Sequence, residues 1–145
     1  IVFPGRDLSG RIKFLTRRSV KTKMFVIDKD VEKEVYLLYH INKDNVKEVY
    51  VCESQINALT LESWGYRAIA LLGTGTAYQY ACLKKSGILK YNLCFDGDKA
   101  GDTAITRFIK NIDNSFISIV SIPRGKDVND LTKEEFDLLD RIEYE

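Results

Sequence analysis

The sequence is poor in the residues that build disulfide-stabilised or zinc-stabilised folds. It contains three cysteines, Cys52, Cys82 and Cys94, and a single histidine among 145 residues. The cysteines are odd in number and have no close pair spacing, which argues against both a disulfide framework and a zinc site. We therefore expect each cysteine to be a small core hydrophobe in a reducing cytoplasm, and His40 to be a packed or surface histidine.

Long apolar runs and targeting patterns are missing as well. No stretch approaches the roughly 20 apolar residues that cross a bilayer, and the chain does not open with a signal-peptide pattern. Internal repeats and low-complexity segments are also missing. We expect a cytoplasmic protein with no membrane contact. Because the first residue is Ile1 rather than methionine, we also expect the chain to be a piece of a longer protein.

The composition is that of a globular protein whose charge is unevenly distributed. A hydrophobic content of 45% and a charged content of 30% allow one domain, or one domain with a short neighbouring piece. Residues 1–27 hold seven basic residues and one acidic residue (7 − 1 = +6), whereas the remainder holds 15 basic and 20 acidic residues (−5). This separation is typical of a basic surface that meets phosphates and an acidic region that holds metal. A solvated, charged antiparallel hairpin explains the composition equally well.

The pattern of the sequence changes near residue 45. Before it, short alternating and apolar runs indicate small strands with turns at Gly5 and Gly10. Val35 to Ile41 fits a buried helix or strand, of which we favour a short helix. After it, strands and helices alternate, which predicts a parallel sheet covered by helices on both faces. The predicted strands are 49–52, 67–72, 91–95 and 116–120, and the predicted helices are 56–64, 76–86, 98–112 and a last one that opens with a capping box at Thr132 and runs through Leu138 and Leu139.

Acidic residues follow three of the four predicted strands. Glu53 follows the first, Asp96 and Asp98 follow the third, and Asp127 lies in the loop after the fourth. Parallel strands end at one edge of their sheet, so these carboxylates are expected to converge there and to suit Mg²⁺ or Mn²⁺. Two simpler interpretations stay open. The Asp-Gly-Asp segment fits a solvated turn that caps a helix, and Glu53 fits an acid at a helix N-terminus.

Taken together, these segments resemble the TOPRIM domain of primases, topoisomerases and certain nucleases. The resemblance rests on Val51 to Leu59 (VCESQINAL) as a strand-Glu-helix motif and on Phe95 to Gly101 (FDGDKAG) as a DxD motif in its bacterial and phage primase form. Leu71 to Thr74 (LLGT) and Ile122 to Asp127 (IPRGKD) resemble further primase turns. Residues 1–45, which include Phe3-Pro4-Gly5-Arg6-Asp7, are similar to the basic subdomain that precedes TOPRIM in these enzymes.

The resemblance implies an α/β fold with a Rossmann-like TOPRIM sheet at residues 46–145, preceded by part of a small basic α+β subdomain at residues 1–45. It implies a nucleotidyltransferase, the catalytic core fragment of a DnaG-type DNA primase that makes short RNA primers on single-stranded DNA, with weak activity expected of the isolated fragment. The implied partners are a single-stranded DNA template, nucleoside triphosphates and a replicative helicase that binds regions outside this chain. The alternatives are a TOPRIM nuclease or topoisomerase fragment and a non-catalytic nucleic-acid-binding module.

The implied site combines acids that hold metal with bases that hold phosphates. Glu53, Asp96 and Asp98 are the expected catalytic residues, and the expected ligands of Mg²⁺ or Mn²⁺ are Asp96, Asp98, Asp127 and Glu53, with Asn129 and Asp130 as further candidates. Asn129 is a departure, because the family usually has an acid there. The residues expected to contact nucleic acid or nucleotide are Arg6, Arg11, Arg17, Lys23 and Lys99.

Overall fold

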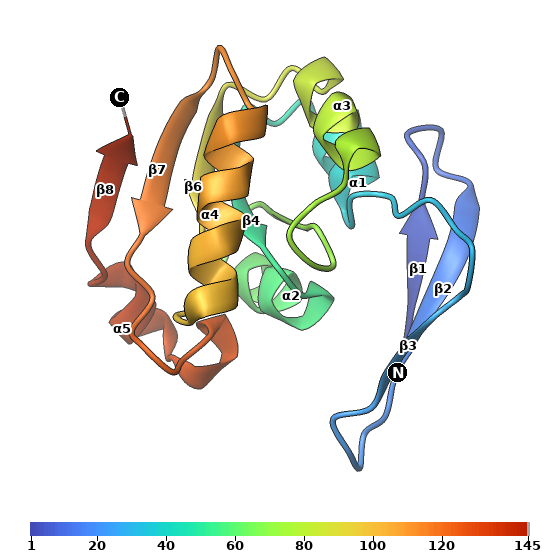
Figure 1. Cartoon of the computed structure of the whole chain (residues 1–145), viewed down its shortest axis with the longest axis horizontal. Helices are drawn as coiled ribbons and strands as arrows, with labels where there is room; N and C mark the ends of the chain where they lie inside the picture. Colours follow the sequence, from blue (N-terminus) through green and yellow to red (C-terminus); the bar gives the residue numbers. More distant parts are fainter. Residues whose placement is uncertain (145) are drawn as a thin grey trace.

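A computed structural model describes residues 1–144 and shows two β-sheets joined by a linker (Figure 1). The smaller sheet is antiparallel and contains β1 (Val2–Arg6), β2 (Ile12–Arg18) and β3 (Phe25–Ile27). The larger sheet has five strands in the order β5-β4-β6-β7-β8. Its strands are β4 (Glu48–Cys52), β5 (Ala68–Ala70), β6 (Lys90–Leu93), β7 (Phe116–Val120) and β8 (Arg141–Tyr144).

The larger sheet confirms the predicted α/β fold class and adds one strand to it. The first four strands of its order pair in parallel, in agreement with the alternating sequence pattern. β8 pairs with β7 in the antiparallel direction and was not predicted. All four of its side chains are exposed, so it lacks the apolar alternation that identifies a half-buried strand. The sheet is therefore mostly parallel with an antiparallel edge, a common arrangement in α/β folds.

Helices cover both faces of this sheet. One face packs against α1 (Leu38–Lys43), α3 (Ala77–Lys85) and α4 (Lys99–Asn111), and the other against α2 (Gln55–Ser63), η1 (Val128–Asp130) and α5 (Lys133–Asp137). Successive residues of β4 alternate between the two cores: Val49 and Val51 join the first, and Cys52 joins the second. Burial on both faces explains why the central strands are almost continuously apolar. Cys52, Cys82 and Cys94 are free and buried, as expected.

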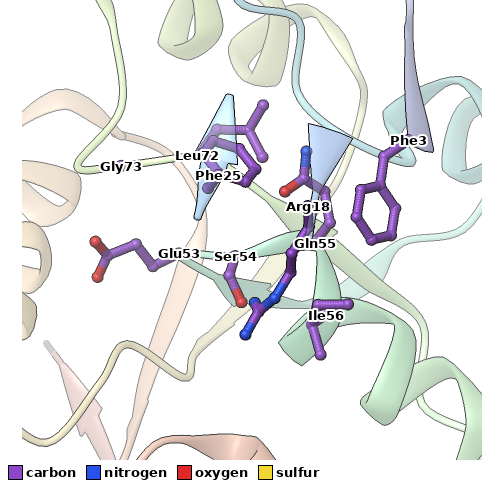
Figure 2. A pocket seen from close by; sticks show the side chains of 9 residues that line it. All are labelled: Phe3, Arg18, Phe25, Glu53, Ser54, Gln55, Ile56, Leu72 and Gly73. Carbon is purple, nitrogen blue, oxygen red and sulfur yellow. The ribbon is translucent and has the colours of Figure 1, made fainter. Parts of the chain in front are cut away.

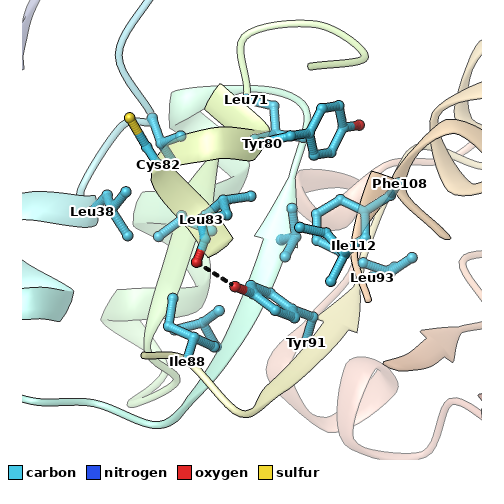
Figure 3. Packing of buried hydrophobic residues seen from close by; sticks show 14 of the residues in the cluster. Leu38, Leu71, Tyr80, Cys82, Leu83, Ile88, Tyr91, Leu93, Phe108 and Ile112 are labelled. Carbon is cyan, nitrogen blue, oxygen red and sulfur yellow. Dashed lines mark hydrogen bonds between the residues drawn. The ribbon is translucent and has the colours of Figure 1, made fainter. Parts of the chain in front are cut away.

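Aromatic packing fixes α4 on the first face of the sheet. The ring of Phe108 lies 5.7 Å from that of Tyr80, 5.2 Å from that of Tyr91 and 6.4 Å from that of Phe95, measured between centroids. Figure 3 shows this core and the hydrogen bond by which the Tyr91 hydroxyl donates to the carbonyl of Leu83 at 3.2 Å. The bond satisfies a polar atom within an apolar core, and it ties β6 to α3.

The helix boundaries follow local capping signals. Asp98 caps α4 at its N-terminus and Ile112 ends it, which matches the predicted helix over 98–112. The capping box of Thr132 and Glu135 is present as predicted. The helix that it opens ends at Asp137, with Leu138 as its C-cap, and is therefore shorter than the helix predicted to run through Leu138 and Leu139.

Two predictions for the first 45 residues need correction. Gly5 lies within β1 beside a β-bulge rather than in a turn, because it pairs with Phe14 of β2. A Cβ there would stand 2.4 Å from the Phe14 ring, so the position requires glycine. The turn at Gly10 is confirmed, with φ at 87°. The short helix begins at Leu38 rather than Val35, because Tyr36 is held extended by a backbone bridge to Ala70.

The helix α1 packs with the larger sheet. Leu38 and Ile41 are buried in the same core as Val49 and Val51. The predicted boundary between residues 45 and 46 therefore places α1 in the N-terminal segment, although its apolar face packs against the sheet of the C-terminal segment. Among residues 1–144, no helix is long and apolar enough to cross a membrane.

Candidate functional site

The three strands that precede acidic residues are neighbours in the larger sheet. β4, β6 and β7 are adjacent, and Val51 pairs with Leu93, which in turn pairs with Ile119. Glu53 follows Val51 by two residues, and Asp96 follows Leu93 by three. β5, which no acid follows, lies at the outer edge. The sheet order thus brings the acid-bearing strand ends together, as the pattern predicted.

A hydrogen-bonded loop pair brings Asp127 back to this edge. The amide of Gly97 donates to the carbonyl of Lys126, and the amide of Gly125 donates to the carbonyl of Gly97, both at 2.8 Å. A Cβ on Gly97 would stand 2.1 Å from the carbonyl oxygen of Pro123. Glycine at this position is therefore what lets the two loops approach closely, which places Asp127 beside Asp96.

The charges of four other acids act on Asp96. Burial, followed in order of size by the charges of Glu53, Asp127, Asp98 and Asp130, raises the pKa of the Asp96 carboxyl to about 7. Burial and the charge of Asp98 also raise the pKa of Glu53. Carboxylates that repel one another at a partly buried position are compensated by a cation in many proteins.

Two of the acids also cap helices, so the turn interpretation and the cluster interpretation describe the same residues. Asp98 Oδ1 accepts from the amide of Gly101 at 2.7 Å, and Asp127 Oδ1 accepts from the amide of Asn129 at 2.8 Å. The amide of Asp127 donates to Asp130 Oδ2 at 3.0 Å. Within the described residues 1–144, no three His, Cys, Asp or Glu side chains form a group that could hold a metal as they stand. The donor chemistry, all oxygen, nevertheless fits Mg²⁺ or Mn²⁺.

Asn57 is a buried polar residue of this site that the sequence analysis did not single out. It lies in the first turn of α2 with 1% of its surface exposed, and its Nδ2 donates to Asp96 Oδ1 at 3.3 Å. Its Oδ1 accepts from Asn129 Nδ2 at 2.6 Å. The signal in the sequence was its position beside Ala58, on the helix face that also buries Leu61. A polar side chain on a buried face needs partners.

The basic residues are spread over the smaller sheet rather than gathered at one point. Arg6 and Arg11 flank the turn between β1 and β2, whereas Lys23 lies in the loop between β2 and β3. Arg17 Nη1 is 2.8 Å from Asp28 Oδ1, and Arg11 Nε is 3.5 Å from Asp7 Oδ2. Arg6 Nη1 donates to the carbonyl of Gly10 at 2.8 Å. Lys99 is exposed at the start of α4, next to Asp98.

A cavity of about 290 Å³ lies between the basic sheet and the acidic edge. Figure 2 shows Arg18 and Phe25 from the smaller sheet together with Glu53 and the first residues of α2. Its complete lining is Phe3, Arg18, Phe25, Glu53, Ser54, Gln55, Ile56, Leu72 and Gly73. The cavity thus joins an arginine, aromatic rings and one acid of the cluster. In the sequence Arg18 is visible only as part of the basic charge of residues 1–27, because the cavity is formed by segments that are far apart in the chain.

A family model described as Toprim-like matches residues 50–132, which include the Glu53, Asp96 and Asp127 segments. The chain belongs to the Toprim-like family. The matched region spans the larger sheet from β4 to the residue that caps α5, so the family assignment rests on the acid-bearing part of this Toprim-like chain.

Curated relatives of this Toprim-like chain are DNA primases. It is 30% identical to the DNA primase of Campylobacter jejuni over 89% of this chain and 22% of that protein. It is 28% identical to the DNA primase of Pseudomonas aeruginosa over 93% of this chain and 23% of that protein. The chain therefore spans about a quarter of the length of these relatives.

A solved structure agrees with these relatives. A DnaG primase catalytic domain bound to single-stranded DNA superposes with a TM-score of 0.75 and 26% identity, over 92% of this chain and 47% of that one. The resemblance to DnaG-type primases that the motifs indicated is confirmed.

Proposed function

We propose that this chain is the catalytic core fragment of a DNA primase, a nucleotidyltransferase that synthesises short RNA primers on single-stranded DNA. The observation that carries the proposal is the convergence of Glu53, Asp98, Asp127 and Asp130 on the partly buried Asp96, beside a cavity that a basic sheet closes. The DNA primase relatives and the DNA-bound DnaG domain support the choice of reaction.

The proposed cofactor is Mg²⁺ or Mn²⁺, held by Asp96, Asp98 and Asp127 with Glu53. When bound, such an ion neutralises the triphosphate and helps to activate the attacking 3′-hydroxyl. Each helix cap occupies Oδ1 of its aspartate, which leaves Oδ2 of Asp98 and of Asp127 to face a cation. Burial and then the neighbouring negative charges raise the pKa of Asp96, and a bound cation would favour its ionised form.

The basic sheet is the proposed partner of nucleic-acid and nucleotide phosphates. Arg6, Arg11, Arg17 and Lys23 lie on it, Arg18 lines the cavity, and Lys99 lies beside the acidic edge. Phosphate contacts of this kind weaken steeply as the salt concentration rises. A replicative helicase is a proposed partner of the longer protein, through regions other than this chain.

The test measures Mn²⁺-dependent or Mg²⁺-dependent incorporation of ribonucleotides on a single-stranded DNA template. We expect the wild-type chain to incorporate label and Asp96→Asn to lose at least about tenfold of that rate, since metal-site substitutions commonly cost this much. Asp113→Asn is the matched control, because Asp113 is an exposed acid that follows α4 and pairs with Lys84. Equal loss in both variants, or unchanged incorporation in Asp96→Asn, would contradict the assigned site.

A further inference from the structure

The buried amide of Asn57 connects the central acid of the site to the loop that carries Asp127. Asn57 Nδ2 donates to Asp96 Oδ1 at 3.3 Å and Asn57 Oδ1 accepts from Asn129 Nδ2 at 2.6 Å. Asn129 Oδ1 in turn accepts from the hydroxyl of Thr60 at 2.5 Å. Four side chains, from the loop after β6, from α2 and from η1, thereby form one hydrogen-bonded chain.

When Asp96 is ionised, its charge sets the direction of every bond in this chain. An ionised carboxylate only accepts hydrogen bonds, so Asn57 must turn its NH₂ group toward Asp96 and its oxygen away. That oxygen then requires a donor, which is the NH₂ group of Asn129, and the oxygen of Asn129 requires a further donor, which is Thr60. Because each amide has one donating and one accepting end, the chain fits together in this sense when Asp96 is ionised, as a bound cation would keep it.

Amides at positions 57 and 129 provide these bonds without adding charge. Asp96 already lies among four carboxylates, and their repulsion contributes to its raised pKa. An aspartate at either position would bring a further carboxylate to this cluster, whereas asparagine offers the same shape, one more donor and no charge. The NH₂ group of Asn129 thus meets an oxygen, Oδ1 of Asn57, that needs a donor.

We propose that Asn57 is a positioning residue that orients the Asp96 carboxylate, and that Asn129 acts on the site through Asn57 rather than as a ligand of its own. This inference rests on the proposed function, because it assigns Asp96 to a divalent cation. Partners that hold a ligand in place change metal affinity by about 10-fold to 100-fold when they are removed. The chain also ties η1, and with it Asp127, to α2.

The experiment measures the dissociation constant of Mn²⁺ by titration calorimetry for the wild-type chain and for Asn57→Ala, Asn129→Ala and the double variant. We expect Asn57→Ala to weaken binding at least about tenfold. Asn129→Ala should weaken it less, and the double variant should bind as Asn57→Ala does, because both act through one chain of bonds. Wild-type affinity in Asn57→Ala would overturn the proposal, and so would effects that multiply in the double variant.

Asn92→Ala is the matched control for loss of a buried amide. Asn92 is 1% exposed and donates to Glu48 Oε1 at 2.9 Å, and Glu48 begins β4 at the opposite end of that strand from Glu53. We expect it to lower the melting temperature without changing the Mn²⁺ affinity of the folded protein. Loss of affinity in this control equal to that in Asn57→Ala would contradict a specific role for Asn57.

Two further variants keep the proposal testable and separate it from the proposed function. If Asn57→Ala does not fold, a second double-mutant cycle uses Thr60→Val and Asn129→Ala. Their double variant should bind Mn²⁺ as Asn129→Ala does. Effects of the two substitutions that multiply would overturn the proposal. Asp96→Asn should abolish the strongest Mn²⁺ binding. Wild-type binding that persists in Asp96→Asn would reject the metal site itself, whereas binding lost there but unchanged in Asn57→Ala would reject only the positioning role.

Discussion

Gln55 Nε2 donates to Thr16 Oγ1 at 2.7 Å, and this buried bond joins the smaller sheet to the first residue of α2. The same hydroxyl donates to the carbonyl of Phe3 at 3.3 Å, so it is satisfied as donor and as acceptor. Gln55 follows Glu53 by two residues and lines the cavity. The bond therefore relates the basic sheet to the acidic edge at the place where a substrate would lie between them.

Gln55→Ala is expected to loosen the smaller sheet. Loss of a buried hydrogen bond that leaves its partner unsatisfied costs about 1–3 kcal/mol. Hydrogen exchange should accelerate in β1, β2 and β3 more than in β6 and α4, because the lost bond holds the smaller sheet to α2. Asn92→Ala, a buried amide within the larger sheet, is the control. Uniform acceleration throughout the chain in Gln55→Ala would show that the bond has no special role between the sheets.

The pKa of Asp96, raised to about 7, predicts how the stability of the metal-free protein depends on pH. The folded state binds this proton more tightly than the unfolded state does. This contribution to stability is therefore full below about pH 4 and is lost as the pH rises to about 7. Asp96→Asn, which cannot ionise, should raise the free energy of unfolding by about 2–4 kcal/mol above pH 7 and by little at pH 4.

Urea unfolding in EDTA at pH 4, 6 and 8 measures this difference. The wild-type chain should lose stability relative to Asp96→Asn over this range, and Asp113→Asn should follow the wild-type chain. Parallel pH profiles for the wild-type chain and Asp96→Asn would contradict the raised pKa. A gain in stability that accompanies a loss of activity is typical of charged functional sites.

Local patterns in the sequence were sufficient to predict the parallel strands, the acidic residues that follow three of them, and most helix ends. Asp98 and Thr132 cap helices through side chains that act within three residues, so their roles are visible in the sequence. The Asn57 contacts and the Arg18 cavity depend on residues that are far apart in the chain. β8 depends on pairing with β7, since its own side chains are exposed. What remained hidden was therefore long-range pairing rather than local preference.

Gly101 is expected to be required for the approach of α4 to the acidic edge. A Cβ there would stand 1.9 Å from the carbonyl oxygen of Asp96, which is backbone and cannot turn aside. Alanine normally stabilises a helix relative to glycine by about 0.5–1 kcal/mol. The overlap should outweigh this gain, so Gly101→Ala should destabilise the chain by about 1–3 kcal/mol.

Chemical unfolding together with Mn²⁺ titration tests the role of Gly101. The shift of α4 should also weaken Mn²⁺ binding, because Asp98 is its N-cap. Thr103→Ala, at an exposed position of the same helix, should change stability by no more than about 0.5 kcal/mol. Stabilisation by Gly101→Ala, as helix preference alone predicts, would show that the two backbones are not held at this distance.

Arg18 is expected to bind the phosphates of a nucleotide whose base or sugar enters the cavity. Arg17, its neighbour, points to Asp28, whereas Arg18 lines the cavity together with Phe25 and Glu53 (Figure 2). A guanidinium suits phosphate oxygens, and an aromatic ring suits a base. Arg18→Ala should therefore weaken nucleoside triphosphate binding by about tenfold, the effect of losing one charge-assisted contact, and leave Mn²⁺ affinity unchanged.

Fluorescence titration with a labelled ribonucleoside triphosphate at two salt concentrations checks this prediction. Because the lost contact is ionic, the difference between Arg18→Ala and the wild-type chain should shrink as salt increases. Lys110→Ala removes a basic side chain from α4 on the far side of the larger sheet from α2, and it should bind nucleotide as the wild-type chain does. Equal nucleotide affinity for Arg18→Ala and the wild-type chain would show that the nucleotide does not bind in the cavity, because a nucleotide bound there would contact Arg18.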